Sequence, residues 1–218
     1  MEALVVLGTG TEIGKTYVSR GLASAWPGCC ALKPVETGVT ERAQDATVLS
    51  SAARHAYTAP LYAFDRPVSP HLEARRTSRP IELPKLAAWV QATATALNRS
   101  RVLVESAGGA FSPLGPSTFN ADLAEILRDA FNCRVLLVAP DRLGVLHDVL
   151  ATQRALAAHS RAADAIILSQ ANAAEYQDLG NATELRALQD APVFEVAHGA
   201  PSPPTLLAYL EMTFTASP

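Results

Sequence analysis

A glycine-bearing loop between an apolar run and a helix-compatible stretch most constrains what this chain can fold into. Residues 8–16 read Gly-Thr-Gly-Thr-Glu-Ile-Gly-Lys-Thr and follow the apolar residues 4–7. Residues 17–25 contain no proline and one glycine, so they can continue as a helix. Backbone N–H groups in such a loop and in the first turn of the helix present positive charge to phosphate oxygens. Lys15 would add a full charge, and the Thr16 hydroxyl would hold Mg²⁺.

The glycine spacing departs from the usual phosphate-loop pattern, G-x-x-x-x-G-K-[ST]. That pattern needs glycine at position 9, where this chain has Thr9, and the glycine lies one residue earlier, at Gly8. The alternative interpretation is an ordinary glycine turn ahead of a helix, with Lys15 in solvent. The order of strand, loop, Lys-Thr and helix favours phosphate binding.

Short apolar runs alternate with helix-compatible stretches along the chain. The runs lie at 4–7, 29–35, 102–105, 133–138, 165–168 and 193–196. The helix-compatible stretches lie at 15–25, 45–53, 86–98, 121–131, 146–159 and 182–189. This alternation predicts an α/β fold, with a mostly parallel sheet and helices on both faces. Ligands of such sheets bind where the strands end.

Composition narrows the class of protein. A chain of 218 residues without an internal linker predicts one domain over residues 1–218. The formal net charge is −3 and no basic run occurs, so we expect neither nucleic acid nor a membrane as a partner. Neither a signal peptide nor a membrane span is recognisable, which predicts a cytoplasmic protein. The odd number of cysteines argues against a disulfide framework, and we expect reduced core residues at Cys29, Cys30 and Cys133.

The second apolar run ends in a lysine. Residues 33–38 read Lys-Pro-Val-Glu-Thr-Gly. A lysine leaving an apolar strand is costly unless its ammonium reaches an anion, so Lys33 is placed to neutralise a transferring phosphoryl group. Thr37 would donate to a ligand carboxylate or carbamate. The alternative is an edge lysine whose ammonium reaches water.

Two carboxylates are candidates for a magnesium site. Glu105 ends the apolar run at 102–105 and precedes Ser-Ala-Gly-Gly, which is where a Mg²⁺ ligand belongs in these sheets. Asp45 stands at the start of a helix-compatible stretch, where it would also serve as an N-cap without any function. Asp45 and Glu105 would complete a three-point magnesium site with Thr16.

Residues 58–84 interrupt the alternation with five of the fifteen prolines. We expect an irregular excursion over one edge of the sheet. It is either a surface loop or a lid or wall of the substrate site.

Four segments together resemble the ATP-dependent dethiobiotin synthetase family. They are residues 8–16, residues 33–38, Ser-Pro-His at 69–71, and Val-Glu-Ser-Ala-Gly-Gly at 104–109. Their order and intervals match from residue 1 to about residue 200. The resemblance implies a P-loop NTPase-like three-layer sandwich. It also implies ureido ring closure in biotin biosynthesis, from 7,8-diaminononanoate (7,8-diaminopelargonate), CO₂ and ATP, through a phosphorylated carbamate.

The resemblance also implies roles for particular residues. Lys33 matches the catalytic lysine, which contacts the carbamate and the γ-phosphate. The metal ligands are Thr16, Asp45 and Glu105, holding Mg²⁺. The nucleotide contacts are Glu12, Ile13, Gly14, Lys15, Thr16, Tyr17, Asp45, Glu105 and Gln170. The substrate contacts are Thr11, Lys33, Thr37, Gly108, Gly109, Gly144 and Leu146. Family members act as homodimers, in which the carboxylate tail of the diamine reaches a helix N-terminus of the partner subunit; residues 143–147 match that segment.

Departures from the family pattern concentrate at the nucleobase. An Asn-Asp pair commonly contacts adenine in the family, whereas this chain has Ser169-Gln170, and Val196-Ala197 replaces Ile-Pro. We therefore expect weaker or broader nucleobase selection, with Gln170 as a substitute contact. Elsewhere, Ser106 replaces a glycine beside the metal ligand, and His147 replaces an asparagine at the tail site.

Two alternative functions share the phosphate loop. One is an amide-forming enzyme of cobalamin synthesis, but the glutaminase-like second domain of such enzymes has no counterpart in this sequence. The other is a P-loop ATPase switch of the partitioning or metal-insertion type. Such switches commonly carry an additional lysine early in the loop, and residues 8–13 contain none.

Overall fold

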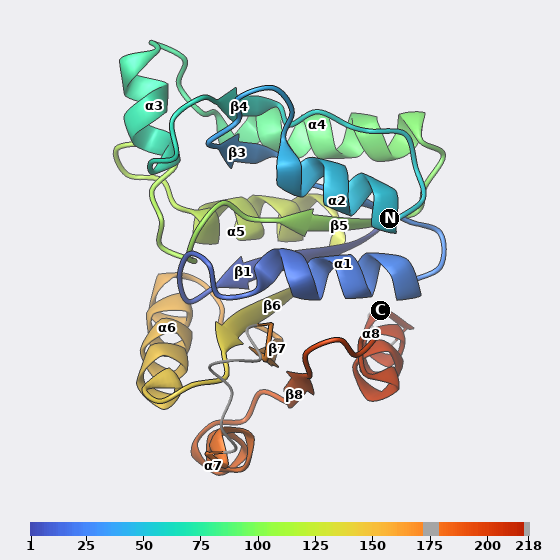
Figure 1. Ribbon diagram of the computed structural model, residues 1–218, viewed down its shortest axis with the longest axis vertical. Helices are drawn as coiled ribbons and strands as arrows, with labels where there is room; N and C mark the ends of the chain where they lie inside the picture. Colours follow the sequence, from blue (N-terminus) through green and yellow to red (C-terminus); the bar gives the residue numbers. More distant parts are fainter. Residues whose placement is uncertain (172–178, 216–218) are drawn as a thin grey trace.

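The computed structural model describes residues 1–171 and 179–215. Its main element is a sheet of six strands in the order β2-β5-β1-β6-β7-β8, and every neighbouring pair is parallel (Figure 1). The strands are β1 (Glu2–Gly8), β2 (Cys29–Leu32), β5 (Arg101–Glu105), β6 (Asn132–Pro140), β7 (Ala165–Ser169) and β8 (Val193–Val196). The expectation of a mostly parallel sheet is confirmed.

Helices cover both faces of this sheet (Figure 1). One face carries α1 (Lys15–Ala25), α2 (Gln44–Ala52) and α8 (Pro204–Thr215). The other carries α4 (Leu83–Ala96), α5 (Asn120–Ala130), α6 (Val145–His159) and α7 (Asn181–Leu188). The helix α8 was not among the expected helices, although Leu206, Leu210 and Phe214 repeat at helical spacing and are buried.

The central strand β1 shows why the sheet is apolar throughout. Leu4 and Val6 pack in the hydrophobic core under α1, α2 and α8. Val5 and Leu7 pack in the separate core under α4 to α7. All four side chains are fully buried. A strand covered on both faces has no exposed side, so it reads as a continuous apolar run rather than an alternating one.

The expected strand at 29–35 is wrong as a single element. It divides at Lys33-Pro34 into β2, which belongs to the main sheet, and β3 (Val35–Thr37), which belongs to a second sheet. Pro34 has no N–H to donate to a neighbouring strand, so the ladder ends before it. The division places Lys33 between the two sheets.

The segment 58–84 is also more ordered than expected. It contains β4 (Tyr62–Phe64), which pairs in parallel with β3, and α3 (Pro70–Arg76). The proline at the start of α3 suits the first helical position, where the missing N–H has no partner to lose. The excursion therefore forms a small sheet and a helix beside the end of the main sheet (Figure 1).

Among the helices of the described residues, none combines the length and the apolar character needed to cross a membrane.

Candidate active site

A cavity of about 980 Å³ opens at the carboxyl ends of the strands. Its wall combines the loop at 11–17, residues after β5, residues after β7, and the segment 67–70. The last of these comes from the proline-rich excursion, so part of that segment forms a wall of this cavity. Most of the predicted site residues line this one cavity: Thr11, Glu12, Ile13, Gly14, Lys15, Thr16, Tyr17, Lys33, Thr37, Asp45, Glu105, Gly108 and Gln170.

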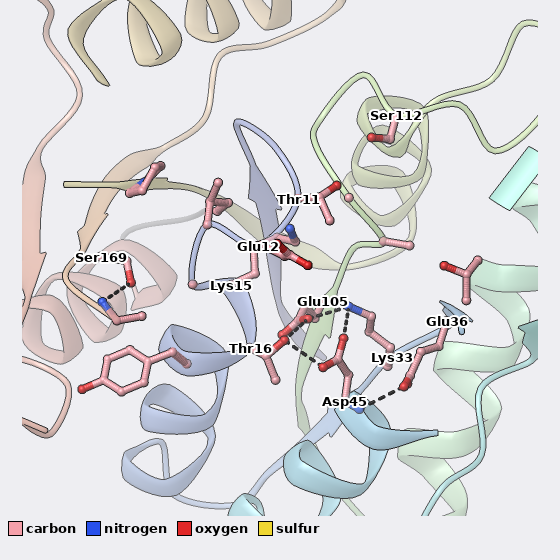
Figure 2. Close-up of a pocket in the computed structure, with 18 of the residues that line it drawn as sticks. Thr11, Glu12, Lys15, Thr16, Lys33, Glu36, Asp45, Glu105, Ser112 and Ser169 are labelled. Carbon is pink, nitrogen blue, oxygen red and sulfur yellow. Dashed lines mark hydrogen bonds and ion pairs between the residues drawn. The ribbon is translucent and has the colours of Figure 1, made fainter. Parts of the chain in front are cut away.

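Lys33 lies at the centre of a charged cluster (Figure 2). Its Nζ atom is 2.5 Å from Glu105 Oε1 and 2.9 Å from Asp45 Oδ2, and it donates to the carbonyl of Ser106 at 3.1 Å. Only 5% of Lys33 is exposed, so the alternative of a lysine reaching water is wrong. Burial opposes its charge, but the carboxylates of Glu105 and Asp45 outweigh burial and raise the pKa of Lys33 above its usual value. The ammonium therefore stays charged.

Thr16, Asp45 and Glu105 converge, as the sequence predicted. The Thr16 hydroxyl lies 3.1 Å from Asp45 Oδ1 and 2.8 Å from Glu105 Oε1 (Figure 2). Glu105 is fully buried, and its second oxygen, Oε2, has no hydrogen-bond partner. Two carboxylates and a hydroxyl are hard oxygen donors, so this group fits a Mg²⁺ ion. No cluster of three His, Cys, Asp or Glu side chains occurs in the described part of the chain.

Asp45 is not the N-cap of its helix. The helix α2 begins one residue earlier, at Gln44, and its first amides are held from another element. Glu36, in β3, accepts hydrogen bonds from the backbone N–H groups of Asp45 and Ala46, both at 3.0 Å. Burial raises the pKa of Glu36, although these two amides oppose the shift. Glu36 therefore serves as the cap of α2. The Asp45 carboxylate is not used for capping, and it faces Thr16 and Lys33.

Lys15 is buried inside the phosphate loop. It is 7% exposed, and its Nζ donates to the carbonyl of Gly10 at 2.8 Å. The alternative of a solvated Lys15 is therefore wrong. Burial, and next the positive charge of Lys33, lower the pKa of Lys15 to about 8. A partly desolvated ammonium with this environment is suited to an incoming polyanion.

The far end of the cavity is lined by residues that follow β7. Gln170 donates to Asp141 Oδ2 at 3.2 Å, and a Cβ atom on Gly14 would lie 2.2 Å from the Ser169 hydroxyl. Gly14 also has a φ of +90°, which favours glycine. Tyr17 donates to the carbonyl of Ala197 at 2.8 Å. Of the departures from the family pattern, Ser169 and Gln170 thus line this end of the cavity, and Ala197 contacts it through Tyr17.

Three predicted substrate contacts do not line the cavity. Gly109 packs its backbone against the phosphate loop, since a Cβ atom there would lie 3.3 Å from Gly10 Cα. Gly144 is the left-handed residue before α6, and Leu146 is in the first turn of that helix. The lining side chains that sequence reasoning missed include Glu36, Ser112, Asp141 and Arg142. For Glu36, its place in the Lys-Pro-Val-Glu motif could have indicated that it lines the site.

Solved structures support the fold. The chain resembles a ParA family ATPase from Chlorobium tepidum TLS, with a TM-score of 0.55 at 10% identity, covering 98% of this chain and 88% of that one. It also resembles chloroplast FtsY from Physcomitrella patens, with a TM-score of 0.55 at 18% identity, covering 98% and 65%. At such low identity these neighbours show a shared α/β P-loop fold and nothing more.

Sequence relatives identify the family. Residues 2–197 match a family model described as an AAA domain. An ATP-dependent dethiobiotin synthetase BioD from Gloeobacter violaceus is 35% identical over 78% of this chain and 72% of its own length. One from Saccharopolyspora erythraea is 33% identical over 90% and 87%. With Lys33 and the phosphate loop meeting in one cavity, the chain belongs to the ATP-dependent dethiobiotin synthetase family.

Proposed function

We propose that this protein closes the ureido ring of dethiobiotin, using 7,8-diaminononanoate, CO₂ and ATP. One amine of the diamine attacks CO₂ and loses a proton, which gives a carbamate. A carbamate oxygen then takes the γ-phosphoryl group, and ADP leaves. The second amine attacks the carbamate carbon and loses a proton, the ring closes and phosphate departs. These steps need positioning and charge stabilisation rather than covalent help from the protein.

The observation that carries this proposal is the cluster around Lys33. A buried ammonium lies within 3 Å of two carboxylates and beside the loop that carries Lys15. Lys33 would stabilise the anionic carbamate and the transferring phosphoryl group, while Lys15 holds the terminal phosphates. Thr16, Asp45 and Glu105 would hold Mg²⁺. When bound, the ion would neutralise phosphate charge and orient the transferring group.

Substrate and nucleotide contacts follow the same cavity. Thr11, Thr37 and Gly108 line its substrate end, and Gln170 lines the end we assign to the nucleobase. We also propose that residues 1–218 act as one domain within a homodimer. The diamine tail would then reach Gly144 and Leu146 of a second subunit, which agrees with their position outside this subunit's cavity.

The test is a defined reaction. Purified protein is incubated with diaminononanoate, bicarbonate, Mg²⁺ and ATP, and dethiobiotin is measured by mass spectrometry. We expect phosphate release that requires both the diamine and bicarbonate. Phosphate release without the diamine that is stimulated by a protein or by DNA would instead indicate an ATPase switch and would overturn the proposal.

A further inference from the structure

A buried amide side chain at the start of α5 contacts the loop between β5 and α5. The proposed reaction assigns no role to it. Asn120, the first residue of α5, is 1% exposed. Its Nδ2 group donates to the carbonyl of Ala107 at 2.7 Å and to the carbonyl of Gly109 at 2.9 Å. One side chain therefore holds the Ala107–Gly108 peptide group, which carries the Gly108 N–H, and the Gly109–Ala110 peptide group.

Backbone hydrogen bonds hold the two ends of this loop, and side chains hold its middle. Ser106 donates its backbone N–H to Val6 at 3.0 Å, and Ala110 donates to Gly8 at 2.7 Å. These bonds attach the loop to β1 and to the start of the phosphate loop. Between them, Gly108 has a φ of +84°, which allows the chain to reverse. Asn120 and the Ser112 hydroxyl, which accepts from the Gly109 N–H at 2.8 Å, hold the residues in between.

Two backbone donors in this stretch remain available to a ligand. Within the part of the chain that the structure describes, the N–H groups of Ala107 and Gly108 make no hydrogen bond. Both residues line the cavity, close to Lys33, whose ammonium contacts the neighbouring Ser106 carbonyl. Consecutive free amides at a glycine turn form a donor pair for an anion, and their value depends on fixed orientation.

The Asn120 side chain is a costly choice for stability alone. Its Oδ1 atom is buried and has no hydrogen-bond partner. An unsatisfied buried acceptor weakens the contribution of the side chain to folding. Asparagine at this position therefore acts mainly through its two donated bonds, which hold the carbonyls of Ala107 and Gly109.

We propose that Asn120 is a positioning residue, which orients the Gly108 amide, and through the shared turn the neighbouring Ala107 amide, to bind the anionic oxygens of the carbamate or of the transferring phosphoryl group. This inference rests on the proposed function. Asn120 does not touch the substrate, and it acts through the loop whose carbonyls it holds.

The test compares two buried carboxamides, one beside the cavity and one away from it. Asn120→Asp replaces the donor group with a carboxylate oxygen. The control is Gln153→Glu, because Gln153 is 8% exposed and joins the Ala163 backbone at 2.8 and 3.3 Å, outside the cavity lining. We expect Asn120→Asp to lower kcat about tenfold or more, to leave the KM for ATP unchanged, and to speed hydrogen exchange at Gly109, whose N–H is held by the Ser112 hydroxyl. Gln153→Glu should lower the melting temperature without changing kcat or this exchange.

Three outcomes would overturn the positioning role. The first is an unchanged kcat and unchanged exchange in Asn120→Asp. The second is a loss of kcat in Gln153→Glu equal to that in Asn120→Asp. If Asn120→Asp does not fold, Asn120→Ala, which brings no charge into the site, replaces it. The third outcome is measured on the wild type. ATP with the diamine should slow hydrogen exchange at Ala107 and Gly108. The absence of this slowing would contradict the inference.

The same experiment separates the two proposals. If the wild type makes no dethiobiotin, the proposed reaction fails. Exchange at Gly109 in Asn120→Asp, and slowing of exchange at Ala107 and Gly108 by ATP alone in the wild type, then still decide whether Asn120 orients the loop.

Discussion

At the scale of single residues, the site depends on charges that are buried together. Lys33 was predicted from the sequence because a lysine at the end of an apolar run needs an anion nearby. The structure supplies two, Asp45 and Glu105. Glu105 was predicted in the same way, as a carboxylate ending an apolar strand. Asn120 was not predictable, because it belongs to no motif and its partners are backbone carbonyls.

Lys33→Ala should lose most turnover and keep nucleotide binding. We expect kcat to fall about 100-fold or more, because a buried charge that stabilises the reacting group is lost. Nucleotide affinity depends mainly on Lys15 and should change little. Kinetics and a fluorescent-nucleotide titration measure the two quantities. Lys85→Ala removes an exposed lysine and serves as the control. A near-normal rate in Lys33→Ala would exclude Lys33 as the catalytic lysine.

Nucleobase selection should be broader than strict use of ATP. Gln170 commits one of its two amide N–H groups to Asp141, so the side chain still offers one donor and its carbonyl oxygen, a pair that can match the edge of more than one base. We expect similar dethiobiotin formation with ATP, CTP and GTP at equal concentrations. The readout is the ratio of kcat/KM values among the three nucleotides. Turnover with ATP alone would show that other residues restore adenine selection.

At the scale of elements, sequence patterns found the main sheet and missed its connections. The apolar runs predicted each strand of the main sheet, because strands covered on both faces are apolar throughout. The division at Pro34 was missed, although proline inside a run argues against a continuous strand. The cap of α2 could not be predicted, because Glu36 reaches the helix from β3. Contacts of this kind depend on how two sheets pack, which no local pattern encodes.

Glu36→Ala should destabilise α2 and disturb the metal ligand on it. Two amides in the first turn lose their acceptor, which costs about 1 kcal/mol in the free energy of unfolding. Asp45, whose own N–H is one of them, should then bind Mg²⁺ less tightly. Urea unfolding and a Mg²⁺ titration of activity measure the two effects. Glu41→Ala, at an exposed position nearby, should change neither. Equal Mg²⁺ dependence in both variants would refute the link between cap and metal site.

At the scale of the whole molecule, the reactivity of the three cysteine thiols should measure global unfolding. Cys29, Cys30 and Cys133 are buried, as the sequence predicted, and burial raises their pKa values to about 11, 12 and 12. A protonated buried thiol is a poor nucleophile. We expect the folded protein to resist a thiol reagent near neutral pH, and the unfolded protein to react at all three positions. Fast reaction of the folded protein would contradict the packing of both cores.

The same thiols set a pH trend for stability. Their pKa values are higher in the folded state than the ordinary value of 9.0, so the unfolded chain loses these protons first. The folded state then binds more protons between pH 9 and about 11, and the free energy of unfolding falls as pH rises through this range. Urea unfolding at stepwise higher pH measures the fall. Replacing all three cysteines with alanine should flatten it.

The strand order also sets when each end of the cavity can form during synthesis. The strands β1, β2 and β5 pair with one another, and the contact between Thr16 and Glu105 spans 89 residues. Every member of the Lys33 cluster therefore leaves the ribosome by the middle of the chain. Gln170 and the residues after β8 emerge last. Because chains fold from their N-terminal side as they are made, the end of the cavity around Lys33 can assemble first, and the end that we assign to the nucleobase is completed last.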